Sequence, residues 1–381
     1  MTTRKIGTAS APLPAAAHEQ RRVTLFYDDR VLQHHPDVGA AFLPGRLDRR
    51  VRELLGGSGL KWAYPEHPGR VRAVLDALEH AAVPGLHFQA GRAATLTELG
   101  RVHTASFLDT ITGLRGQNAW VDVDTTAVSP GSLEAAMVAA GTATAAVEAV
   151  VRGETRSSFA LVRPPGHHAE PTRARGFCLF NNVAVAAAHA QAELGCNRVL
   201  IIDWDAHHGN GTQEIFFADP DVMLFDTHRS APFYPGSGNL AEVGAGLGEG
   251  TIVNVPLPAG AGDAALISAF NDILVPAADW FQPDLVLVSA GFDAHQFDLA
   301  LNATFAGFGA LTGVVQGIAD RHCEGRLTFV LEGGYHLEAL AGGVRTVLEV
   351  LAGAPPPIPR ECGLQEVSEA AAFHLPGFAQ D

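Results

Sequence analysis

Six short apolar runs with the length and composition of β-strands constrain the fold of this chain more than any other feature. They are rich in Val, Ile, Leu and Phe, and their hydrophobic residues follow one another instead of alternating with polar residues. Continuous hydrophobicity is typical of strands covered on both faces, as in a parallel sheet. The runs lie at 23–26, 159–162, 199–202, 222–225, 285–288 and 327–331.

Ala- and Leu-rich stretches of helical length separate these runs, at 132–151, 182–194 and 263–280. This alternation predicts one α/β domain with a mostly parallel sheet. Hydrophobic residues make up 47% of the 381 residues and charged residues 18%, which excludes a disordered or collagenous chain. We expect a compact domain at 23–354, a loosely ordered N-terminal arm at 1–22, and a C-terminal tail at 355–381 that begins with three prolines.

Composition also limits the partners and the compartment. A net charge of -15 would repel phosphate backbones, so we expect no nucleic-acid partner, whereas a cationic substrate is compatible with it. No apolar run approaches the ~18 uninterrupted residues of a membrane span, so we expect no membrane partner. Four scattered cysteines without CxxC spacing and an N-terminus without an apolar signal segment predict a cytoplasmic protein. Homo-oligomer formation is left open.

Polar clusters follow four of the apolar runs at the point where each run ends. They read RPPGHHAE after 162, DWDAHHGNG after 202, GFDAH after 290, and LEGGYH after 330. In open parallel sheets, ligands bind outside the carboxyl ends of the strands. The four clusters are therefore expected to meet at one site.

The second cluster has the spacing of metal ligands. If the chain stays extended after the strand, Asp203, Asp205 and His207 point to one side. Asp293 in the third cluster supplies a further carboxylate. Two carboxylates, one imidazole and an open position are typical of a catalytic site for zinc or a similar divalent metal. Equally, the DxH pattern alone is compatible with residues that only cap the next helix.

Two adjacent histidines and a tyrosine complete a plausible set of catalytic groups. His167 and His168 could serve as base and acid, since neutral imidazole exchanges protons near neutral pH. Tyr335 follows two glycines, which would let its phenol approach a substrate and stabilise an oxyanion. Taken singly, a histidine pair at the surface or a tyrosine packed in a loop would need no function. Their combination at four strand ends favours a catalytic site.

These clusters resemble the zinc-dependent histone deacetylases and their bacterial relatives, the class II-like histone deacetylase-like amidohydrolases and acetylpolyamine amidohydrolases. The likeness is carried by the segments 163–182, 201–217, 289–295 and 331–336, and it extends from about residue 64 to residue 350. It implies an arginase/deacetylase-like single domain, with helices on both faces of an eight-stranded, mostly parallel sheet.

The resemblance also implies a role for each motif residue. Two carboxylates and an imidazole match the zinc ligands, the histidine pair matches the general base and its electrostatic partner, and the tyrosine matches the oxyanion donor. In this order the residues are Asp205, His207 and Asp293, then His168 and His167, then Tyr335.

Two further positions match supporting residues of the family. Asp203 matches a carboxylate that orients the first histidine and helps to bind a structural K⁺ ion. Asn210 stands where class I enzymes have a second orienting aspartate, which places the chain with class II and the polyamine enzymes. The metal expected from the resemblance is Zn²⁺, with Fe²⁺ or another divalent metal as the alternative in the cell.

The family binds the acylated side chain in a narrow tunnel. Gly176 and Phe177 match one wall, Tyr234 matches the facing wall, and Asp124 matches a rim aspartate that holds the substrate backbone. The usual Asp-Pro-Leu after the third ligand is replaced by Asp-Leu-Ala, so that Ala300 occupies a rim position where a glutamate selects polyamines in one branch.

The sequence thus predicts an enzyme that hydrolyses an acylated primary amine such as acetyl-lysine in a peptide or protein. An acetylpolyamine or another small amide is the alternative substrate. Two other classes of protein match the motifs less well. A manganese ureohydrolase needs aspartate-rich motifs that DAHHG and GFDAH do not match, and a non-catalytic acyl-lysine binder would not need every catalytic side chain.

Overall fold

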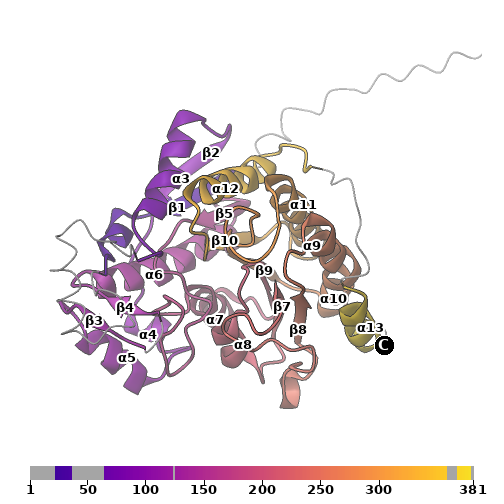
Figure 1. The fold of residues 1–381 in the computed structure, drawn as a ribbon, viewed down its shortest axis with the longest axis horizontal. Helices are drawn as coiled ribbons and strands as arrows, with labels where there is room; N and C mark the ends of the chain where they lie inside the picture. Colours follow the sequence, from indigo (N-terminus) through magenta and orange to yellow (C-terminus); the bar gives the residue numbers. More distant parts are fainter. Residues whose placement is uncertain (1–21, 37–63, 123–124, 358–366, 379–381) are drawn as a thin grey trace, which may run out of the picture.

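Eight parallel strands form the centre of the molecule, in the order β2-β1-β5-β10-β9-β6-β7-β8 (Figure 1). The structure, a computed structural model, describes residues 22–36, 64–122, 125–357 and 367–378. The strands are β1 (Val23–Tyr27), β2 (Leu86–Ala90), β5 (Ser157–Ala160), β6 (Val199–Asp203), β7 (Val222–Arg229), β8 (Ile252–Leu257), β9 (Leu285–Ala290) and β10 (Leu327–Leu331). A separate antiparallel pair consists of β3 (Ala119–Trp120) and β4 (Ala127–Val128).

All six strands expected from the apolar runs are present, and the two further strands of the eight-stranded sheet lie at its edges. β2 is mostly exposed, and Phe88 in its middle is 60% exposed. β8 contains Asn254 and Pro256, which break the apolar run. An edge strand has a partner on one side only and is not obliged to be apolar on both faces, so neither strand carries the continuous pattern.

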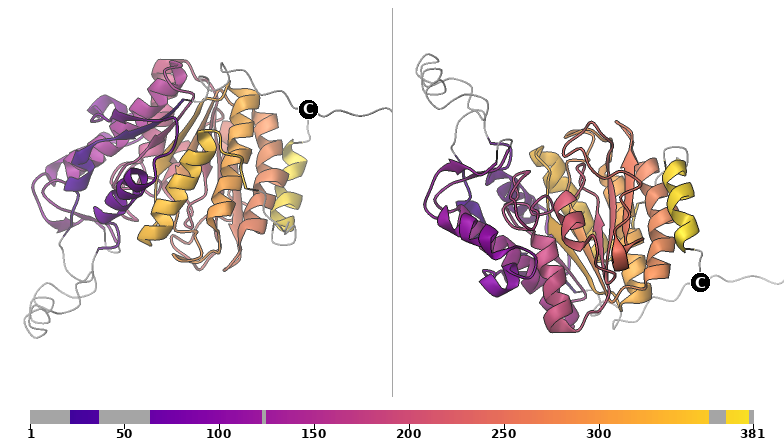
Figure 2. Two further views of the ribbon diagram at one scale, coloured as in Figure 1. Left: turned by 90° about the horizontal axis from the view of Figure 1, so that it is seen from above. Right: turned by 90° about the horizontal axis from the view of Figure 1, so that it is seen from below.

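Helices cover the sheet in two groups on opposite sides (Figure 2). α6 packs against α7 on one side, and α3, α12, α11 and α9 follow one another on the other side. The helices are α3 (Gly69–His80), α4 (Leu96–Leu99), α5 (Ala105–Gly113), α6 (Ser132–Val151), α7 (Asn182–Leu194), α8 (Asn210–Phe216), α9 (Asp263–Ala269), α10 (Val275–Phe281), α11 (Phe305–His322), α12 (Leu337–Leu351) and α13 (Ser368–Phe378). Short helical turns are η1 (Asp29–Gln33), η2 (Gly246–Gly248) and the π-helix η3 (Phe270–Leu274).

Two helical segments of the described chain are long and apolar enough to cross a membrane, Ser132–Val151 and Asp263–Phe281. In their most apolar windows, 72% and 61% of the residues are buried inside the protein. Helices buried in a protein core meet the same length and hydropathy criteria, so these segments are weak support for a membrane span.

The carboxyl ends of the central strands lie level with one another. Asp203 of β6 is in register with Ser289 of β9, and Ala290 of β9 is in register with Leu331 of β10. The polar clusters that follow β5, β6, β9 and β10 therefore start at the same edge of the sheet, as the strand pattern predicts. Part of the sequence-predicted tail forms α13, which packs on α10 and β8.

Local caps hold the segments beside this edge. The Asn181 side chain caps α7 by accepting a hydrogen bond from the Ala184 N–H. His336 caps α12 in the same way through Nδ1, directly after Tyr335. Capping satisfies N–H groups at a helix start that have no partner within the helix. The two caps therefore fix where the loops around the polar clusters end.

Candidate metal and catalytic site

Asp205, His207 and Asp293 bring three ligand atoms together at the carboxyl edge of the sheet. His207 Nδ1 lies 3.0 Å from an Asp205 oxygen and 3.1 Å from an Asp293 oxygen. Both carboxylates are fully buried, and one atom from each of the three side chains lies within 4.8 Å of the others. Of the three alternating residues, Asp205 and His207 turn toward one point, where Asp293 joins them. Asp203 is not part of this group and contacts His167 Nδ1 instead.

The charges of this group favour a bound cation. Burial and the negative charge of Asp205 raise the pKa of Asp293 to about 6. Burial opposes a charge on His207, but Asp293 and Asp205 raise its pKa to about 10. Asp293 Oδ2, the oxygen 3.1 Å from His207 Nδ1, is buried and makes no well-aligned hydrogen bond. Two carboxylates facing one imidazole nitrogen, with one oxygen unsatisfied, fit a divalent metal with mixed N and O ligands.

Glycines and backbone N–H groups hold the two carboxylates in place. Asp205 accepts a hydrogen bond from the Gly333 N–H at 2.9 Å, and Asp293 accepts one from the Ala206 N–H at 2.9 Å. A Cβ atom added to Gly291 would overlap Asp205, and one added to Gly333 would overlap Asp293. The loops after β9 and β10 can therefore pass close to the ligands only because these positions are glycine.

His167 and His168 lie side by side after β5, with ring centroids 4.0 Å apart. Nδ1 of His167 lies 2.9 Å from Asp203, and Nδ1 of His168 lies 2.8 Å from the Asn210 carbonyl oxygen. Burial opposes protonation of both rings. The charges of Asp203 and Asp205 nevertheless raise the pKa of His167, whereas burial and the neighbouring His167 lower the pKa of His168.

Tyr335 is held by Arg70 of α3 and by Asp298 in the loop after β9. The Arg70 guanidinium lies 5.1 Å from the centre of its ring and donates hydrogen bonds to the carbonyls of Gly334, at 2.6 Å, and Glu332, at 2.5 Å. Asp298 accepts a hydrogen bond from the Tyr335 N–H at 2.6 Å. Burial and the charge of Asp293 raise the Tyr335 pKa well above its usual value, so the phenol keeps its proton at neutral pH.

Aromatic residues from two loops lie next to these groups. Phe177 meets Tyr335 edge to face, with ring centroids 5.8 Å apart, and Tyr234 meets His168 in the same way at 5.2 Å. Gly176 and Phe177 both have positive φ. Phe233, which we did not predict from the sequence, stacks on His207 at 4.7 Å. The sequence-predicted rim residue Asp124 lies outside the described residues.

Several other contributors to the site were not singled out in the sequence. Glu332 is fully buried and accepts hydrogen bonds from the N–H groups of Gly166 and His167. Glu170 binds the Asn210 side-chain amide, and Arg70 supports Tyr335. The signals for Glu332 and Glu170 are an acidic residue directly after a strand and one two positions after the histidine pair. Arg70 carries no such signal.

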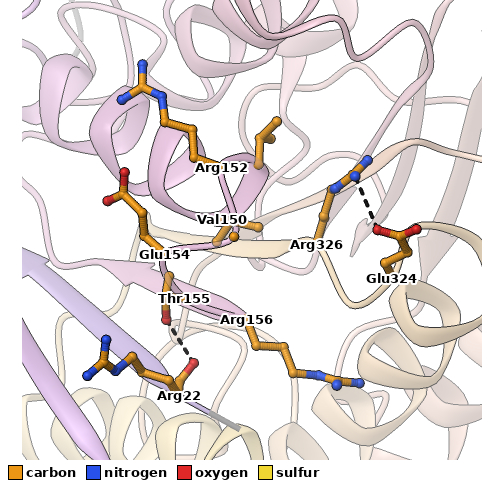
Figure 3. Close-up of a pocket in the computed structure, with 10 residues that line it drawn as sticks. Arg22, Val150, Arg152, Glu154, Thr155, Arg156, Glu324 and Arg326 are labelled. Carbon is orange, nitrogen blue, oxygen red and sulfur yellow. Dashed lines mark hydrogen bonds and ion pairs between the residues drawn. The ribbon is translucent and has the colours of Figure 1, made fainter. Parts of the chain in front are cut away.

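Two other features of the described chain do not resemble this site. Glu98, Glu148 and His189 could group around a metal ion, but Arg92 already forms ion pairs with both carboxylates. A cavity of about 720 Å³ lies at the opposite, amino ends of β1, β5 and β10 (Figure 3). Its lining includes Arg152 at the C-terminus of α6, where a cation complements the helix dipole.

Carboxylate, imidazole and phenol groups gathered at the carboxyl edge of a parallel sheet are the groups that metal-assisted hydrolysis uses. Residues 64–351 match the family profile of the histone deacetylase domain. A histone deacetylase-like amidohydrolase of Pseudomonas aeruginosa is 36% identical over 335 residues, covering 87% of each chain. Histone deacetylase 14, chloroplastic, of Arabidopsis thaliana is 38% identical over 356 residues, covering 88% of this chain and 81% of the relative.

Two further comparisons agree. The solved HDA15 HD domain superimposes with a TM-score of 0.82 at 36% identity, covering 94% of this chain and 96% of that one. A human polyamine deacetylase is 38% identical over 348 residues, covering 85% of this chain and 51% of the relative. The chain belongs to the histone deacetylase family, and it is an amide-bond hydrolase with the family's fold.

Proposed function

We propose that this enzyme is a zinc-dependent deacetylase that converts an acylated primary amine, such as acetyl-lysine, to the free amine and acetate. The observation that carries this proposal is the meeting of Asp205, His207 and Asp293 beside His168 and Tyr335. When bound by the first three residues, a divalent metal supplies Lewis acidity, which polarises the amide carbonyl and makes water more acidic. Zinc suits this ligand set, and Fe²⁺ is the alternative.

The histidines move the protons in this mechanism. His168 is the neutral ring of the pair, so its free nitrogen takes a proton from the attacking water. His167 is the ring favoured as a cation by Asp203, so it stabilises negative charge beside the reacting carbonyl. A protonated histidine of the pair then donates a proton to the amine nitrogen as the C–N bond breaks.

Tyr335 stabilises the charge that develops on the substrate carbonyl oxygen. Its phenol stays protonated, and Arg70 and Asp298 hold its ring and backbone. A donor fixed before the reaction stabilises an oxyanion without reorganisation. Phe177 and Tyr234 would enclose the methylene stem of the acylated amine, which contributes ~0.8 kcal/mol for each buried CH₂ group.

An acetylpolyamine is the second candidate substrate, because one relative is named a polyamine deacetylase. Ala300 provides no carboxylate for a second ammonium group at the rim. We therefore favour an acyl-lysine peptide. A side-by-side measurement of kcat/KM with an acetyl-lysine peptide and N-acetylputrescine tests this preference, and a higher value for N-acetylputrescine would reverse it.

The test of the activity itself uses protein loaded with Zn²⁺ or Fe²⁺ and assayed for acetate release. We expect release from at least one of the two substrates, and loss of release when a chelator removes the metal. No acetate from either substrate with either metal would refute the proposed function and favour a non-catalytic acyl-lysine binder.

We also propose a structural K⁺ ion near Asp203. This carboxylate is fully buried close to Asp226, and burial raises its pKa well above the usual value. A monovalent cation at this place would stabilise both carboxylates. Omitting K⁺ is expected to lower the melting temperature, and adding it back should restore that temperature.

The remaining proposals concern partners and compartment. Cys178, Cys196 and Cys323 are buried free thiols, and Cys362 lies outside the described residues. Free thiols fit the cytoplasm that we propose for this enzyme. The absence of nucleic-acid and membrane partners, the open question of a homo-oligomer, and the boundaries at 22 and 354 stay predictions.

A further inference from the structure

A closed ring of polar and aromatic contacts surrounds His168. The Asn210 side chain contacts His168 Nδ1 and Glu170. Arg175 contacts Glu170 and the Tyr234 hydroxyl, and the Tyr234 ring packs edge to face against His168. The distances along this ring are 2.8, 2.8, 3.0 and 3.0 Å for the polar contacts and 5.2 Å between the final two ring centroids. In every polar contact except the one between His168 and Asn210, it is clear which group donates the hydrogen bond and which accepts it.

The contact between His168 and Asn210 depends on which end of the Asn210 amide faces the imidazole ring. The amide has a carbonyl oxygen that only accepts hydrogen bonds and an NH₂ group that only donates them. Seen from His168 alone, either end is acceptable, because neutral imidazole offers a donor at one nitrogen and an acceptor at the other. A neutral His–Asn pair therefore has no preferred polarity of its own.

Glu170 removes this ambiguity. Its carboxylate accepts hydrogen bonds from Arg173 and Arg175, so only a donor can face it from Asn210. The Asn210 NH₂ group lies 2.8 Å from Glu170 Oε1, which turns the Asn210 carbonyl toward His168 Nδ1. Nδ1 must then carry the hydrogen, and Nε2 is left as the nitrogen that can accept a proton.

The position of Glu170 is itself fixed. Its side chain is buried, and Arg173 and Arg175 form ion pairs with its carboxylate, partly through the same oxygen that accepts from Asn210. Its backbone carbonyl lies 3.0 Å from His103 Nδ1, and Arg175 is tethered to the Tyr234 hydroxyl. The carboxylate therefore cannot turn away from Asn210 without breaking contacts with several residues.

We propose that Glu170 is a positioning residue that sets the tautomer of His168 by orienting Asn210. This inference rests on the proposed role of His168 as the general base. An aspartate at position 210 would present acceptor oxygens in either orientation and would need no orienting partner. The carboxylate of Glu170 is thus required because position 210 is an asparagine.

A double-mutant cycle tests the proposal. Glu170→Met removes the acceptor, so the Asn210 side-chain amide can rotate by 180°. In zinc-loaded enzyme we expect kcat to fall at least about tenfold, with a smaller change in KM. Asn210→Asp is also expected to be impaired, because two carboxylates then face each other. Combining the two substitutions should raise kcat above that of Asn210→Asp alone. Glu170→Gln keeps an acceptor and should retain more activity than Glu170→Met.

Two controls separate orientation from simple tethering. Arg173→Met removes an ion pair of Glu170 at an exposed side chain and leaves the Asn210 contact, so kcat should stay within about twofold. If Glu170 only stabilises the loop, Glu170→Met will lower kcat by the same factor whether residue 210 is asparagine or aspartate. That equality would overturn the proposal, as would the absence of any loss with asparagine.

A spectroscopic readout is independent of catalysis. The ¹⁵N shifts of the imidazole nitrogens distinguish the two neutral tautomers of His168, which can be assigned by comparison with His168→Gln. The zinc-loaded wild type should show the hydrogen on Nδ1, and Glu170→Met should show a mixture or the opposite tautomer. The expected tautomer shift in an enzyme without activity would support Glu170 and refute only the proposed function. An unchanged tautomer in Glu170→Met would refute the role of Glu170.

Discussion

At the scale of single residues, the site depends on side chains that are buried yet carry or stabilise charge. Asp293 is buried beside Asp205, and Tyr335 is partly buried near Asp293 and Arg70. In a low dielectric environment, each of these groups affects its neighbours more strongly than it would in water. Small substitutions at these positions should therefore change the chemistry more than the fold.

Tyr335→Phe removes the phenolic hydroxyl and keeps the ring against Phe177 and Arg70. We expect kcat to fall by roughly 10²- to 10³-fold, with KM changed far less, because the lost hydrogen bond forms mainly in the transition state. Steady-state kinetics of the zinc-loaded enzyme measure both constants. Tyr27→Phe, the same change in β1 at a hydroxyl bonded to Asp29, is the matched control and should leave kcat unchanged. A wild-type kcat in Tyr335→Phe would exclude the oxyanion role.

At the scale of secondary-structure elements, buried ion pairs join segments that are distant in the sequence. Glu66, just before α3, is fully buried with Arg70 of α3 and with Arg163, which follows β5. Burial opposes the charge of Glu66, but Arg163, His34 and Arg70 hold its pKa well below the usual value. This group ties the start of α3 to the loops around the histidine pair and Tyr335.

Glu66→Gln is expected to destabilise the fold by about 3 to 5 kcal/mol, because it leaves two guanidinium groups buried without a counter-charge. Urea unfolding of both proteins measures the difference. Glu349→Gln breaks an exposed pair with Arg345 in α12 and should cost less than about 1 kcal/mol. Equal costs for the two substitutions would show that the buried group does not join these elements.

His103 should make stability depend on pH. Burial lowers its pKa to about 4 from the ordinary 6.5, while its ring nitrogens contact the Glu170 carbonyl and the Asn181 N–H. The unfolded chain therefore binds more protons between these values, so the contribution of neutral His103 is complete above about pH 6.5 and is lost as pH falls toward 4.

Substitution of this histidine should consequently weaken the pH dependence. Between about pH 7 and 4.5, the free energy of unfolding should fall less steeply in His103→Gln than in the wild type. Measurements with a chelator present exclude metal loss as a cause. Identical slopes would contradict the prediction. Some slope should remain in the variant, because burial also lowers the His208 pKa to about 4.

At the scale of the whole molecule, the candidate metal site joins loops from separate strands. Asp205 and His207 follow β6 and Asp293 follows β9, while Gly333 after β10 binds Asp205. A ligand that binds only the folded state stabilises that state, by an amount that grows with the logarithm of its concentration relative to Kd. Metal binding should therefore stabilise the sheet edge as a unit.

Removal of the metal should lower the melting temperature, and Zn²⁺ at 100 times its Kd should restore about 2.7 kcal/mol of stability. Scanning calorimetry with chelator and with added Zn²⁺ measures the shift. Asp293→Asn removes one ligand, so its melting temperature should respond far less to Zn²⁺. A shift of the same size in Asp293→Asn would place the stabilising zinc elsewhere.

The sequence by itself determined the class of fold and most of the residues at the candidate site. Central strands must be apolar on both faces, so β6, β9 and β10 were visible as continuous runs. Functional groups at the carboxyl ends of parallel strands converge by the geometry of the sheet, so the motifs after those strands indicated one site. The roles given to these residues stay predictions.

Only the tertiary structure decided the edges of the sheet and the residues that support the site. β2 and β8 are held by one neighbouring strand each, and their sequences carry no continuous apolar pattern. Arg70 bonds the Gly334 carbonyl across 264 positions of the chain. Glu170 acquires its partner at Asn210 only when the loops after β5 and β6 meet. Contacts between distant segments depend on packing, which leaves no periodic pattern in the sequence.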